Sequence, residues 1–352
     1  MKTQIWKNKK VLLTGHTGFK GAWLSLWLSQ LGAQVHGVAL DPPTDLNLYT
    51  LAKISSLLAS DIRLDIRHEQ EVRQLLCEIQ PEIVFHLAAQ PLVRYSYDYP
   101  LETYAVNVMG TAHVLEAIRA CGSVAAAVIV TTDKCYENLE RIEPYSEVDR
   151  LGGFDPYSNS KACAELVTAA YRSSFFSGKG APRLASARAG NVIGGGDWAK
   201  NRLIPDCIRA YTANNSVHLR FPESVRPWQY VLESLSGYLL LAEKLLSDEG
   251  ERFAQAWNFG PELHDMQSVG EVANQVCGIL KVPLVFSQQK QEKHEAGLLR
   301  LDSAKAKQYL GWTPRWNLRT AIEETVKWYQ SWLEGKVVRD FSWDQIERYG
   351  HG

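Results

Sequence analysis

A tyrosine and a lysine near the middle of the chain have the types and the spacing that proton transfer with an alcohol requires. Tyr157 and Lys161 lie in a helix-compatible segment that starts at Pro156, and because they are four positions apart they share one helix face. We expect the charge of Lys161 to lower the pKa of the Tyr157 phenol from about 10, which makes Tyr157 a candidate general base. A Tyr-x-x-x-Lys pattern alone is usually a surface coincidence, so its meaning depends on the surrounding elements.

A second set of reactive side chains follows an apolar run. Residues 125–130 read Ala-Ala-Ala-Val-Ile-Val, and the run ends at Thr131-Thr132-Asp133-Lys134. This pattern predicts a buried strand whose carboxyl end carries hydroxyl, carboxylate and ammonium groups. Ligands of parallel α/β sheets bind at the carboxyl ends of the strands. We therefore expect Thr131 to Lys134 to face a ligand together with Thr14 and Ala88, which follow two other predicted strands.

The elements that would position these groups begin with a glycine-rich loop. An apolar run, Val11–Leu13, is followed by Gly15, Gly18 and Gly21 and then by a helix-compatible segment, residues 22–31. Strand, glycine turn and helix in this order are typical of a dinucleotide-binding loop, in which the amides at the helix start face a diphosphate. The first interval is one residue wider than in Gly-x-Gly-x-x-Gly, and three glycines alone also fit a plain turn.

Strands that alternate with helices continue through the first half of the chain. The expected strands are 34–40, 61–65, 82–87, 123–131 and a sixth that ends at Arg188, with helices at 68–80, 100–121 and 156–176. This alternation predicts an α/β fold, a Rossmann-type doubly wound parallel sheet, over residues 1–189. Residues 190–335 break the alternation and are expected to form mainly a smaller C-terminal α/β substrate-binding domain, with some segments returning to the first. Residues 336–352 are interpreted as a tail or an oligomer contact.

Two aspartates after predicted strands could bind the adenosine part of a dinucleotide. Asp41 lies twenty residues past Gly21, where a carboxylate can accept hydrogen bonds from the ribose. Since it would repel a 2′-phosphate and no arginine follows it, the sequence favours NAD over NADP. A turn or N-cap aspartate before Pro42 is the alternative. Asp65, with Ile66, could lie beside the adenine, although a helix cap is an equal alternative.

Length, composition and charge exclude several classes of partner. The 352 residues are 45% hydrophobic and 22% charged, which is ordinary for a globular protein with a large core. A net charge of −1 gives no electrostatic drive toward nucleic acid or an anionic membrane. The six cysteines form no Cys-x-x-Cys pair, so neither a metal site nor a redox motif is predicted. We find no signal peptide and no apolar run near the ~20 residues that a membrane span needs, and expect a cytoplasmic protein.

In their order along the chain, these motifs resemble the extended short-chain dehydrogenase/reductase family. The segments that match are the glycine loop, Asp41, Asp65-Ile66, His86-Leu-Ala-Ala89, Asn107 and Tyr157-x-x-x-Lys161. The match continues with Arg188-Ala-Gly-Asn-Val192, Arg226-Pro227, Trp257-Asn-Phe-Gly-Pro261 and Asp302-x-x-Lys305-Ala306-x-x-x-Leu310-Gly311-Trp312-x-Pro314. The resemblance therefore covers about residues 8–335, nearly the whole chain.

Within this family, Thr132-Asp133 followed by an ionisable residue is similar to the nucleotide-sugar 4,6-dehydratases. Thymidine- and GDP-linked members usually carry Glu at the next position. Lys134 departs from that and resembles the branch that acts on CDP-glucose, as do residues 14–21, 90–94 and 194–198. The resemblance implies an NAD-dependent lyase of deoxysugar synthesis, of the kind that supplies the O-antigen of lipopolysaccharide, and a homodimer or homotetramer.

The resemblance also assigns roles to individual residues. Those implied in catalysis are Thr132, Asp133, Lys134, Tyr157 and Lys161. Those implied in cofactor binding are Gly15, His16, Thr17, Gly18, Phe19, Lys20, Gly21, Asp41, Asp65, Ile66, Leu87, Ala88, Ala89, Asn107, Thr131, Tyr157 and Lys161. Those implied in substrate binding are Gln90, Arg94, Thr132, Asn191, Asn201, Leu203, Ile204 and Arg226, the last as a diphosphate clamp. No metal is implied, and Arg202, Arg209 and Arg220 receive no role.

The chemistry that the resemblance implies is internal oxidation and reduction of a sugar. Tyr157 takes the proton of the C4 hydroxyl while hydride passes to NAD, Thr132 holds the C4 oxygen, and Asp133 protonates the leaving C6 hydroxyl. Lys134 either removes the C5 proton or only orients Asp133 or a water. The rival functions are a dehydratase for a dTDP-, UDP- or GDP-linked sugar, a 4-epimerase or decarboxylase, which needs no acid at Asp133, and a non-catalytic NAD-binding sensor, which needs none of these groups together.

Overall fold

The core of the molecule is a seven-stranded parallel sheet. A computed structural model describes residues 3–178, 180–219, 221–286 and 296–351. The sheet order is β11-β6-β5-β4-β1-β2-β3, and every neighbouring pair is parallel. Its strands are β1 (Lys10–Thr14), β2 (Gln34–Ala39), β3 (Ser60–Arg63), β4 (Ile83–His86), β5 (Ala126–Val130), β6 (Arg183–Ala189) and β11 (Ala256–Phe259). Because the order reverses between β1 and β4, this is the doubly wound α/β sheet that the alternation predicts.

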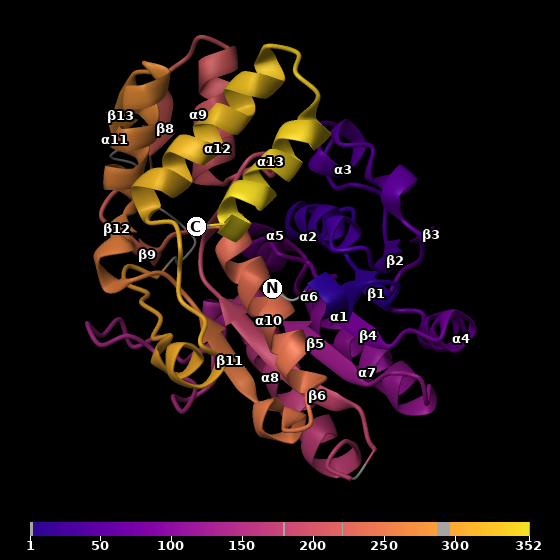
Figure 1. Cartoon of the computed structure of the whole chain (residues 1–352). Helices are drawn as coiled ribbons and strands as arrows, with labels where there is room; N and C mark the ends of the chain where they lie inside the picture. The colour runs from indigo at the N-terminus through magenta and orange to yellow at the C-terminus, as the bar shows by residue number, and fades with distance from the viewer. Residues whose placement is uncertain (1–2, 179, 220, 287–295, 352) are drawn as a thin grey trace.

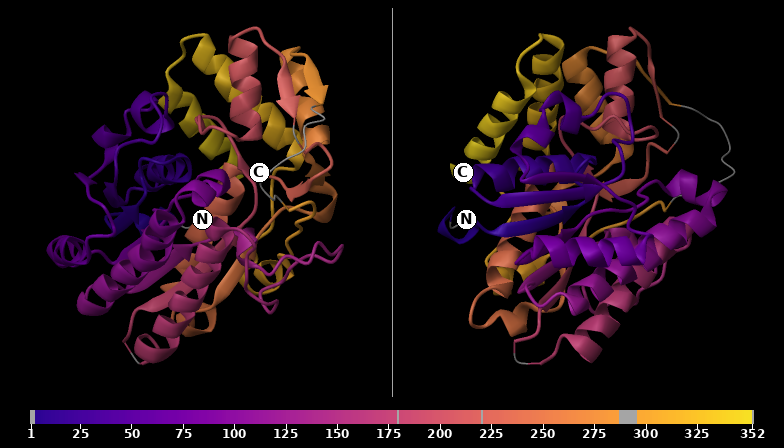
Figure 2. Two further views of the ribbon diagram at one scale, coloured as in Figure 1. Left: turned by 180° about the vertical axis from the view of Figure 1, so that it is seen from behind. Right: turned by 90° about the vertical axis from the view of Figure 1, so that its right-hand side faces the viewer.

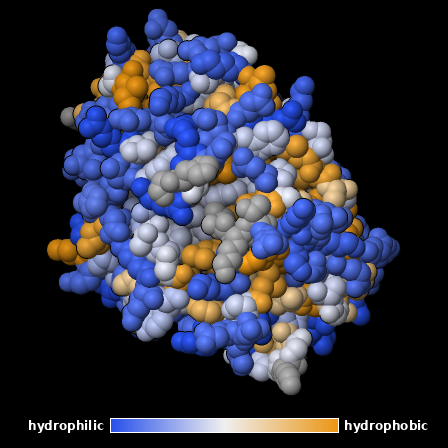
Figure 3. All heavy atoms as spheres, viewed as in Figure 1, coloured by the Kyte–Doolittle hydropathy of each residue, from blue (hydrophilic) through white to orange (hydrophobic). Residues whose placement is uncertain are grey.

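Helices cover both faces of the sheet because alternate strand residues point to opposite sides. Leu12, Val84 and Ile129 pack under α4 (Glu69–Ile79), α7 (Gly110–Ala120) and α8 (Pro156–Phe175). Their neighbours Val11, Phe85 and Val128 face the other way, in the core formed with α2 (Phe19–Gln30) and α10 (Val231–Leu245). Figures 1 and 2 show the sheet between these two helix layers. On the face that Figure 3 shows, the surface is mostly hydrophilic and apolar residues form small separate groups.

A second group of elements lies beyond the carboxyl edge of the sheet, at the top of Figure 1. Its helices are α9 (Leu203–Thr212), α11 (Val269–Leu280) and α12 (Leu318–Leu333), and its short strands form the pairs β7 (Val192–Ile193) with β10 (Gln229–Tyr230), β8 (Val217–Leu219) with β13 (Leu284–Phe286), and β9 (Val225–Pro227) with β12 (Met266–Ser268). Helix α10 and strand β11, which come from the same half of the chain, pack on or join the large sheet.

Short helices fill the remaining connections. They are α1 (Thr3–Trp6), α3 (Leu48–Leu51), η1 (Ile54–Leu57), α5 (Val93–Asp98), α6 (Pro100–Tyr104), η2 (Ala105–Met109), η3 (Asp133–Cys135), η4 (Gly250–Phe253), η5 (Leu263–Asp265) and η6 (Ala306–Leu310). The helix expected over 100–121 contains one π-helical turn, η2, between α6 and α7. Such turns often occur at functional sites, and this one contains Asn107.

The C-terminal segment is an integral helix, so the interpretation of residues 336–352 as a tail is wrong. Helix α13 (Val338–His351) packs against α2 and α12. Tyr349 is fully buried, and its hydroxyl donates to Glu233 Oε2 on α10 at 2.7 Å. Arg315 Nη1 donates to the Tyr349 carbonyl at 2.9 Å. The helix is fixed by buried polar contacts that a sequence pattern does not reveal.

The described ranges contain neither a candidate membrane span nor a cluster of metal-binding side chains. No helix there is long and apolar enough to cross a bilayer. No three His, Cys, Asp or Glu side chains in the same ranges gather as a metal would require. All six cysteines are unpaired thiols.

Candidate active site

The glycine loop closes tightly onto the end of β4 and leaves the start of α2 open. Gly15 has φ +78, and a Cβ there would lie 2.7 Å from the Ala88 amide nitrogen. A Cβ on Gly21 would lie 2.1 Å from the Gly15 carbonyl oxygen, so only glycine allows this helix to approach the loop. Gly18 is the N-cap of α2, and no side chain caps the helix. The loop therefore offers the uncapped amides and positive dipole end that bind a diphosphate.

The other side chains of this loop contact the protein itself, and their roles in cofactor binding stay predictions. Thr17 Oγ1 donates to the Leu40 carbonyl at 2.9 Å, and His16 is fully buried against Gly37 with its Nε2 2.7 Å from Asp61 Oδ1. Phe19 packs on the main core. Lys20 turns inward, where its Nζ donates to the Tyr238 hydroxyl at 3.1 Å. Burial and the nearby Arg202 charge lower the pKa of Lys20 to about 8.

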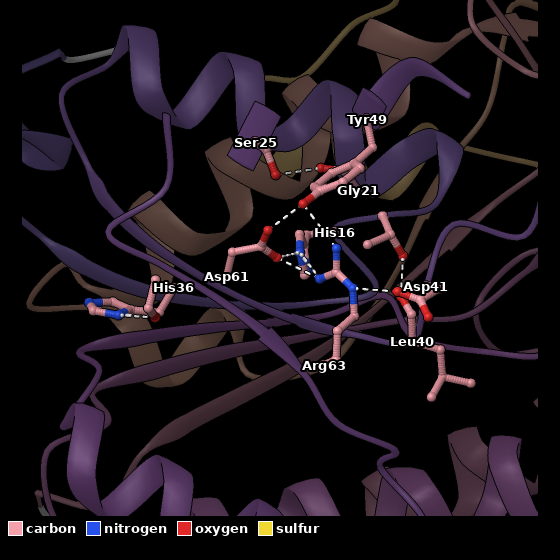
Figure 4. Close-up of polar contacts among 11 residues, drawn as sticks. His16, Gly21, Ser25, His36, Leu40, Asp41, Tyr49, Asp61 and Arg63 are labelled. Atoms are coloured by element: carbon pink, nitrogen blue, oxygen red, sulfur yellow. Dashed lines mark hydrogen bonds and ion pairs between the residues drawn. The ribbon is translucent and has the colours of Figure 1, made fainter. Parts of the chain in front are cut away.

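Asp41 lies just beyond β2, where the carboxylate for the adenosine ribose was predicted. The prediction that it has no arginine beside it holds along the sequence but not in space. Arg63, the last residue of β3, donates from Nε to Asp41 Oδ1 at 2.9 Å (Figure 4). β2 and β3 are parallel neighbours, so their carboxyl ends lie side by side although 22 residues separate Asp41 and Arg63.

Asp65 and Ile66, the pair predicted to lie beside the adenine, both contact other residues of the protein. Asp65 accepts hydrogen bonds from the Arg67 backbone nitrogen at 2.9 Å and from its guanidinium at 2.6 Å. Ile66 is buried, and a Cβ on Gly110 would lie 2.5 Å from its Cδ1. The adenine contact expected for Asp65 and Ile66 stays a prediction, and Ile66 is also a core residue.

A buried relay fixes the backbone that follows β4. Thr14 Oγ1 accepts from the amides of Leu87 and Ala88, each at 3.1 Å, and lies 2.8 Å from His86 Nδ1. His86 Nε2 lies 3.1 Å from Thr111 Oγ1. Burial, helped by the Lys161 charge, lowers the pKa of His86 to about 3, so the imidazole is neutral. Because the Thr111 hydroxyl donates to the Asn107 carbonyl, it accepts from His86 Nε2, which leaves Nδ1 to accept from Thr14. Ala89 follows this fixed backbone.

Asn107 holds the segment that follows Ala89. Its Oδ1 accepts from the Gln90 amide at 2.8 Å, and its Nδ2 donates to the Gln90 carbonyl at 3.1 Å and to Ser160 Oγ at 2.9 Å. Gln90 Nε2 in turn donates to Thr103 Oγ1 at 2.9 Å. The amide of Asn107 thus joins the loop after β4 to helix α8, so its place in the predicted cofactor site is that of a positioning residue.

Thr132 and Asp133 follow β5, after Thr131, and Asp133 opens η3. Thr132 Oγ1 donates to Asp133 Oδ1 at 2.9 Å and lies 3.4 Å from the Lys134 amide. The second carboxyl oxygen, Oδ2, is buried and has no hydrogen-bond partner in the described chain. Burial raises the pKa of Asp133, and the charges of Lys134 and Arg226 oppose this rise. A buried carboxyl group with a raised pKa and one oxygen free of hydrogen bonds has the features of a general acid.

Tyr157 and Lys161 lie on one face of α8 at the same sheet edge, but their electrostatics differ from the prediction. Burial raises the pKa of Tyr157, and the hydrogen bond with the Thr132 hydroxyl and the charge of Arg202 oppose this rise. The expected lowering below the ordinary value is therefore wrong for this structure, because loss of hydration outweighs nearby charge. Lys161 Nζ donates to the Val130 carbonyl at 3.3 Å, and burial lowers its pKa to about 8.

Behind these residues, a buried ion pair joins α8 to β6. Arg188 Nη2 donates to Glu165 Oε2 at 2.8 Å, and the two side chains are 4% and 3% exposed. Glu165 also accepts from Ser186 Oγ at 2.7 Å and from Thr131 Oγ1. Arg188 Nη1 donates to the Tyr136 hydroxyl at 2.8 Å. This network fixes both ends of the segment that carries Thr132, Asp133 and Lys134.

The predicted substrate residues lie on several elements. Arg226 is buried on β9, and its guanidinium donates to the Val225 carbonyl at 2.9 Å and to the Ala296 carbonyl. Its charge opposes the rise that burial gives the pKa of Asp133. Gln90 and Arg94 are half-buried near the start of α5, Asn191 precedes β7, Asn201 has φ +62 before α9, and Leu203 and Ile204 open α9. Their contacts with a sugar nucleotide stay predictions.

Sequence reasoning missed two groups that act on this site. Arg202 Nη1 donates to Asp197 Oδ2 at 2.8 Å, and its charge affects the pKa values of Tyr157 and Lys20. Tyr238 on α10 receives the inward-turned Lys20. Neither residue lies in a motif with fixed spacing, although the position of Arg202 directly before α9 was a usable signal. Arg220 lies outside the described residues.

The sheet order, the glycine loop and the polar strand ends define a dinucleotide-binding α/β protein, and comparison identifies its family. The profile of the family described as GDP-mannose 4,6 dehydratase matches residues 12–325. The chain therefore belongs to this family.

Two relatives match nearly end to end. The chain is 48% identical to a CDP-glucose 4,6-dehydratase of Salmonella typhimurium, over 98% of this chain and 97% of that protein. It is 27% identical to a dTDP-glucose 4,6-dehydratase of Xanthomonas campestris pv. campestris, over 96% and 98% of the two chains.

Solved structures share the fold. An epimerase of Methanothermobacter thermautotrophicus superimposes with a TM-score of 0.80 at 22% identity, covering 96% of each chain. A dTDP-glucose 4,6-dehydratase from Bacillus anthracis, solved in complex with NAD, gives a TM-score of 0.76 at 21% identity and covers 92% of this chain and 97% of that one.

Proposed function

We propose that this protein is a CDP-glucose 4,6-dehydratase that converts CDP-glucose to CDP-4-keto-6-deoxyglucose and water, a hydro-lyase reaction. The observation that carries the proposal is the buried Asp133 carboxyl, held by Thr132 beside Lys134 at the end of β5, with the Tyr157 phenol near Thr132. A 4-epimerase needs no acid at this position. The 48% identity with the Salmonella dehydratase supports CDP-glucose as the substrate.

NAD is the cofactor that the residues fit. Gly15, Gly18 and Gly21 leave room for a diphosphate at the uncapped start of α2, where a side chain on Gly15 or Gly21 would meet backbone. The Asp41 carboxylate lies just beyond β2, where it can accept hydrogen bonds from a ribose. When bound, NAD supplies the hydride acceptor and donor for the sugar.

The first task of the protein side chains is to remove a proton from the C4 hydroxyl. Tyr157 is the base, and Lys161 lies one helical turn away on α8. The Thr132 hydrogen bond and the Arg202 charge, which oppose the rise that burial gives the pKa of Tyr157, favour the phenolate that this step needs. The Thr132 hydroxyl holds the C4 oxygen as it becomes a carbonyl. Because Lys161 already donates to the Val130 carbonyl, its ammonium group is fixed with respect to β5.

The second task is elimination of water across C5 and C6. The C4 ketone acidifies the C5 hydrogen, and Lys134 takes that proton. Asp133 gives its proton to the C6 hydroxyl, so the C6–O bond breaks and water leaves. Burial raises the pKa of Asp133, which favours the protonated form that this step needs. Return of hydride to C6, with a proton delivered to C5 by Lys134, completes a reaction without net oxidation. The proton that Tyr157 took from the C4 hydroxyl balances, through solvent, the one that Asp133 gave to the leaving water. The product is suited to deoxysugar supply for lipopolysaccharide.

A second copy of the chain is the expected partner. Leu101 on α6, Met109 on η2 and Leu166 on α8 are 84%, 52% and 58% exposed, and these elements contact one another. Figure 2 shows the helices of residues 100–120 and 156–175, in purple and magenta, side by side. Exposed apolar side chains on neighbouring helices are typical of an interaction surface, and the commonest soluble oligomer is a dimer about a two-fold axis. Sedimentation analysis should give a dimer, and Leu166→Glu should give a monomer.

The proposed reaction has a specific isotopic signature. In D₂O, CDP-glucose should give a 4-keto-6-deoxy product with one solvent deuterium at C5, and the hydrogen removed from C4 should be retained at C6. Mass spectrometry and NMR of the product read both positions. Recovery of a CDP-hexose changed only at C4 would contradict the proposal and indicate an epimerase.

A further inference from the structure

Arg63 and Asp41 meet at the rim of the proposed cofactor site, where β3 and β2 end (Figure 4). The ion pair is 2.9 Å long, and the Asp41 side chain is 88% exposed while that of Arg63 is 35% exposed. Exposed ion pairs contribute little to stability. The fold therefore does not require this pair, and both groups lie where a ligand could reach them.

Arg63 is held in place by groups other than Asp41. Its Nη1 donates to Asp61 Oδ1 at 2.6 Å, its Nη2 donates to the Tyr49 hydroxyl at 2.9 Å, and the guanidinium lies 5.2 Å from the centre of the Tyr49 ring. Asp61 is itself bound by the Tyr49 hydroxyl and lies 2.7 Å from His16 Nε2. Figure 4 shows these side chains converging on the guanidinium while its Nε side faces Asp41. Losing the Asp41 charge would leave Arg63 oriented.

The two groups have opposite preferences for the adenosine ribose. A carboxylate at this place accepts hydrogen bonds from ribose hydroxyls and repels a 2′-phosphate, whereas a neighbouring arginine accommodates that phosphate. A guanidinium binds phosphate through paired N–H donors of fixed geometry. In this chain the group that could bind the phosphate is Arg63, and it is hydrogen-bonded to Asp41, the group that would repel the phosphate.

We propose that Arg63 is a preoriented 2′-phosphate-binding residue that Asp41 blocks, so that the Asp41–Arg63 pair sets the choice between NAD and NADP. The proposal rests on the cofactor assignment above. It implies that removing the Asp41 charge alone, without adding a residue, lets this edge of the cofactor site bind a 2′-phosphate. Asp61 and Tyr49 make that conversion possible because they hold Arg63 from the other side.

The test compares two nucleotides that differ only in the 2′-phosphate. Binding of 5′-AMP and of 2′,5′-ADP is measured by calorimetry on the native chain and on Asp41→Asn, whose amide oxygen can still accept from Arg63. The ratio of affinities should move at least about tenfold toward 2′,5′-ADP, the scale of one hydrogen bond between charged groups. The double variant Asp41→Asn, Arg63→Gln should lose this gain. Asp45→Asn removes the same charge from the same exposed loop and should leave the ratio unchanged.

Three outcomes would overturn the proposal: no gain in Asp41→Asn, a gain that survives in the double variant, or an equal gain in Asp45→Asn. NAD binding by the native chain is measured in parallel. Absence of NAD binding overturns the proposed function, whereas normal NAD binding without an Arg63-dependent gain overturns only the blocked phosphate site.

Discussion

Replacing Glu165 with glutamine should destabilise the protein by about 3–5 kcal/mol, because it leaves Arg188 as an uncompensated buried charge. The two side chains are 3% and 4% exposed and their hydrogen bond is 2.8 Å long, so water cannot replace the lost partner. For 352 residues, an unfolding entropy of about 2.1 cal/mol/K per residue corresponds to about 0.7 kcal/mol per degree. The melting temperature of Glu165→Gln should therefore be about 4–7 °C lower than that of the native chain.

Calorimetric unfolding of the native chain, Glu165→Gln, Arg188→Met and the double variant measures this pair. The double variant should lose less stability than the two single variants together, because methionine fills the space without a charge. Burial alone would raise the pKa of Glu165, but Arg188 and the hydrogen bonds from Thr131 and Ser186 lower it below its ordinary value. Its contribution is therefore complete above the unfolded pKa of about 4.3 and is lost as pH falls below it. A melting temperature of Glu165→Gln within about 1 °C of native at pH 7, or additive single losses, would refute this reasoning.

Three further predictions concern catalysis and the C-terminal helix. Tyr157→Phe should keep its fold and NAD content and lose at least ~100-fold in rate; turnover near the native value would exclude Tyr157 as the base. Lys134→Ala should still oxidise C4, so reduced cofactor and a 4-keto-glucose nucleotide accumulate while exchange of the C5 hydrogen with D₂O stops; exchange at the native rate would show that Lys134 only orients its neighbours. Burial raises the pKa of Glu233 to about 7, so the folded chain binds a proton that the unfolded chain has already released, and native stability should fall by roughly 3 kcal/mol between pH 4 and 8. Glu233→Gln should remove that slope in thermal melts, and an unchanged slope would place the titration elsewhere.

The sheet and the edge that carries the chemistry are predictable from local pattern. Apolar runs that end at Thr14, His86 and Val130 mark strands, and parallel strands between helices bring their carboxyl ends to one edge. Tyr157 and Lys161 share a helix face because of their spacing alone. The fold class was therefore confirmed, and the predicted catalytic residues Thr132, Asp133 and Tyr157 were found together.

The remaining features depend on contacts between distant segments. Arg63 reaches Asp41 only because β3 pairs with β2, and Lys20 points to Tyr238, 218 residues away. The pKa of Tyr157 depends on burial, which spacing does not give. The docking of α13 depends on a buried hydrogen bond between Tyr349 and Glu233. Sequence patterns report local periodicity, and none of these contacts is local.

The central claim is most directly tested by the substrate. The purified protein is incubated with NAD and, separately, with CDP-, dTDP-, UDP- and GDP-glucose, and formation of the 4-keto-6-deoxy sugar nucleotide is followed as kcat/KM. We expect the product with CDP-glucose at a kcat/KM well above those of the other three nucleotides. No 4-keto product from any of them would contradict the assignment as a 4,6-dehydratase, and a higher kcat/KM with another nucleotide would contradict the assignment of CDP-glucose.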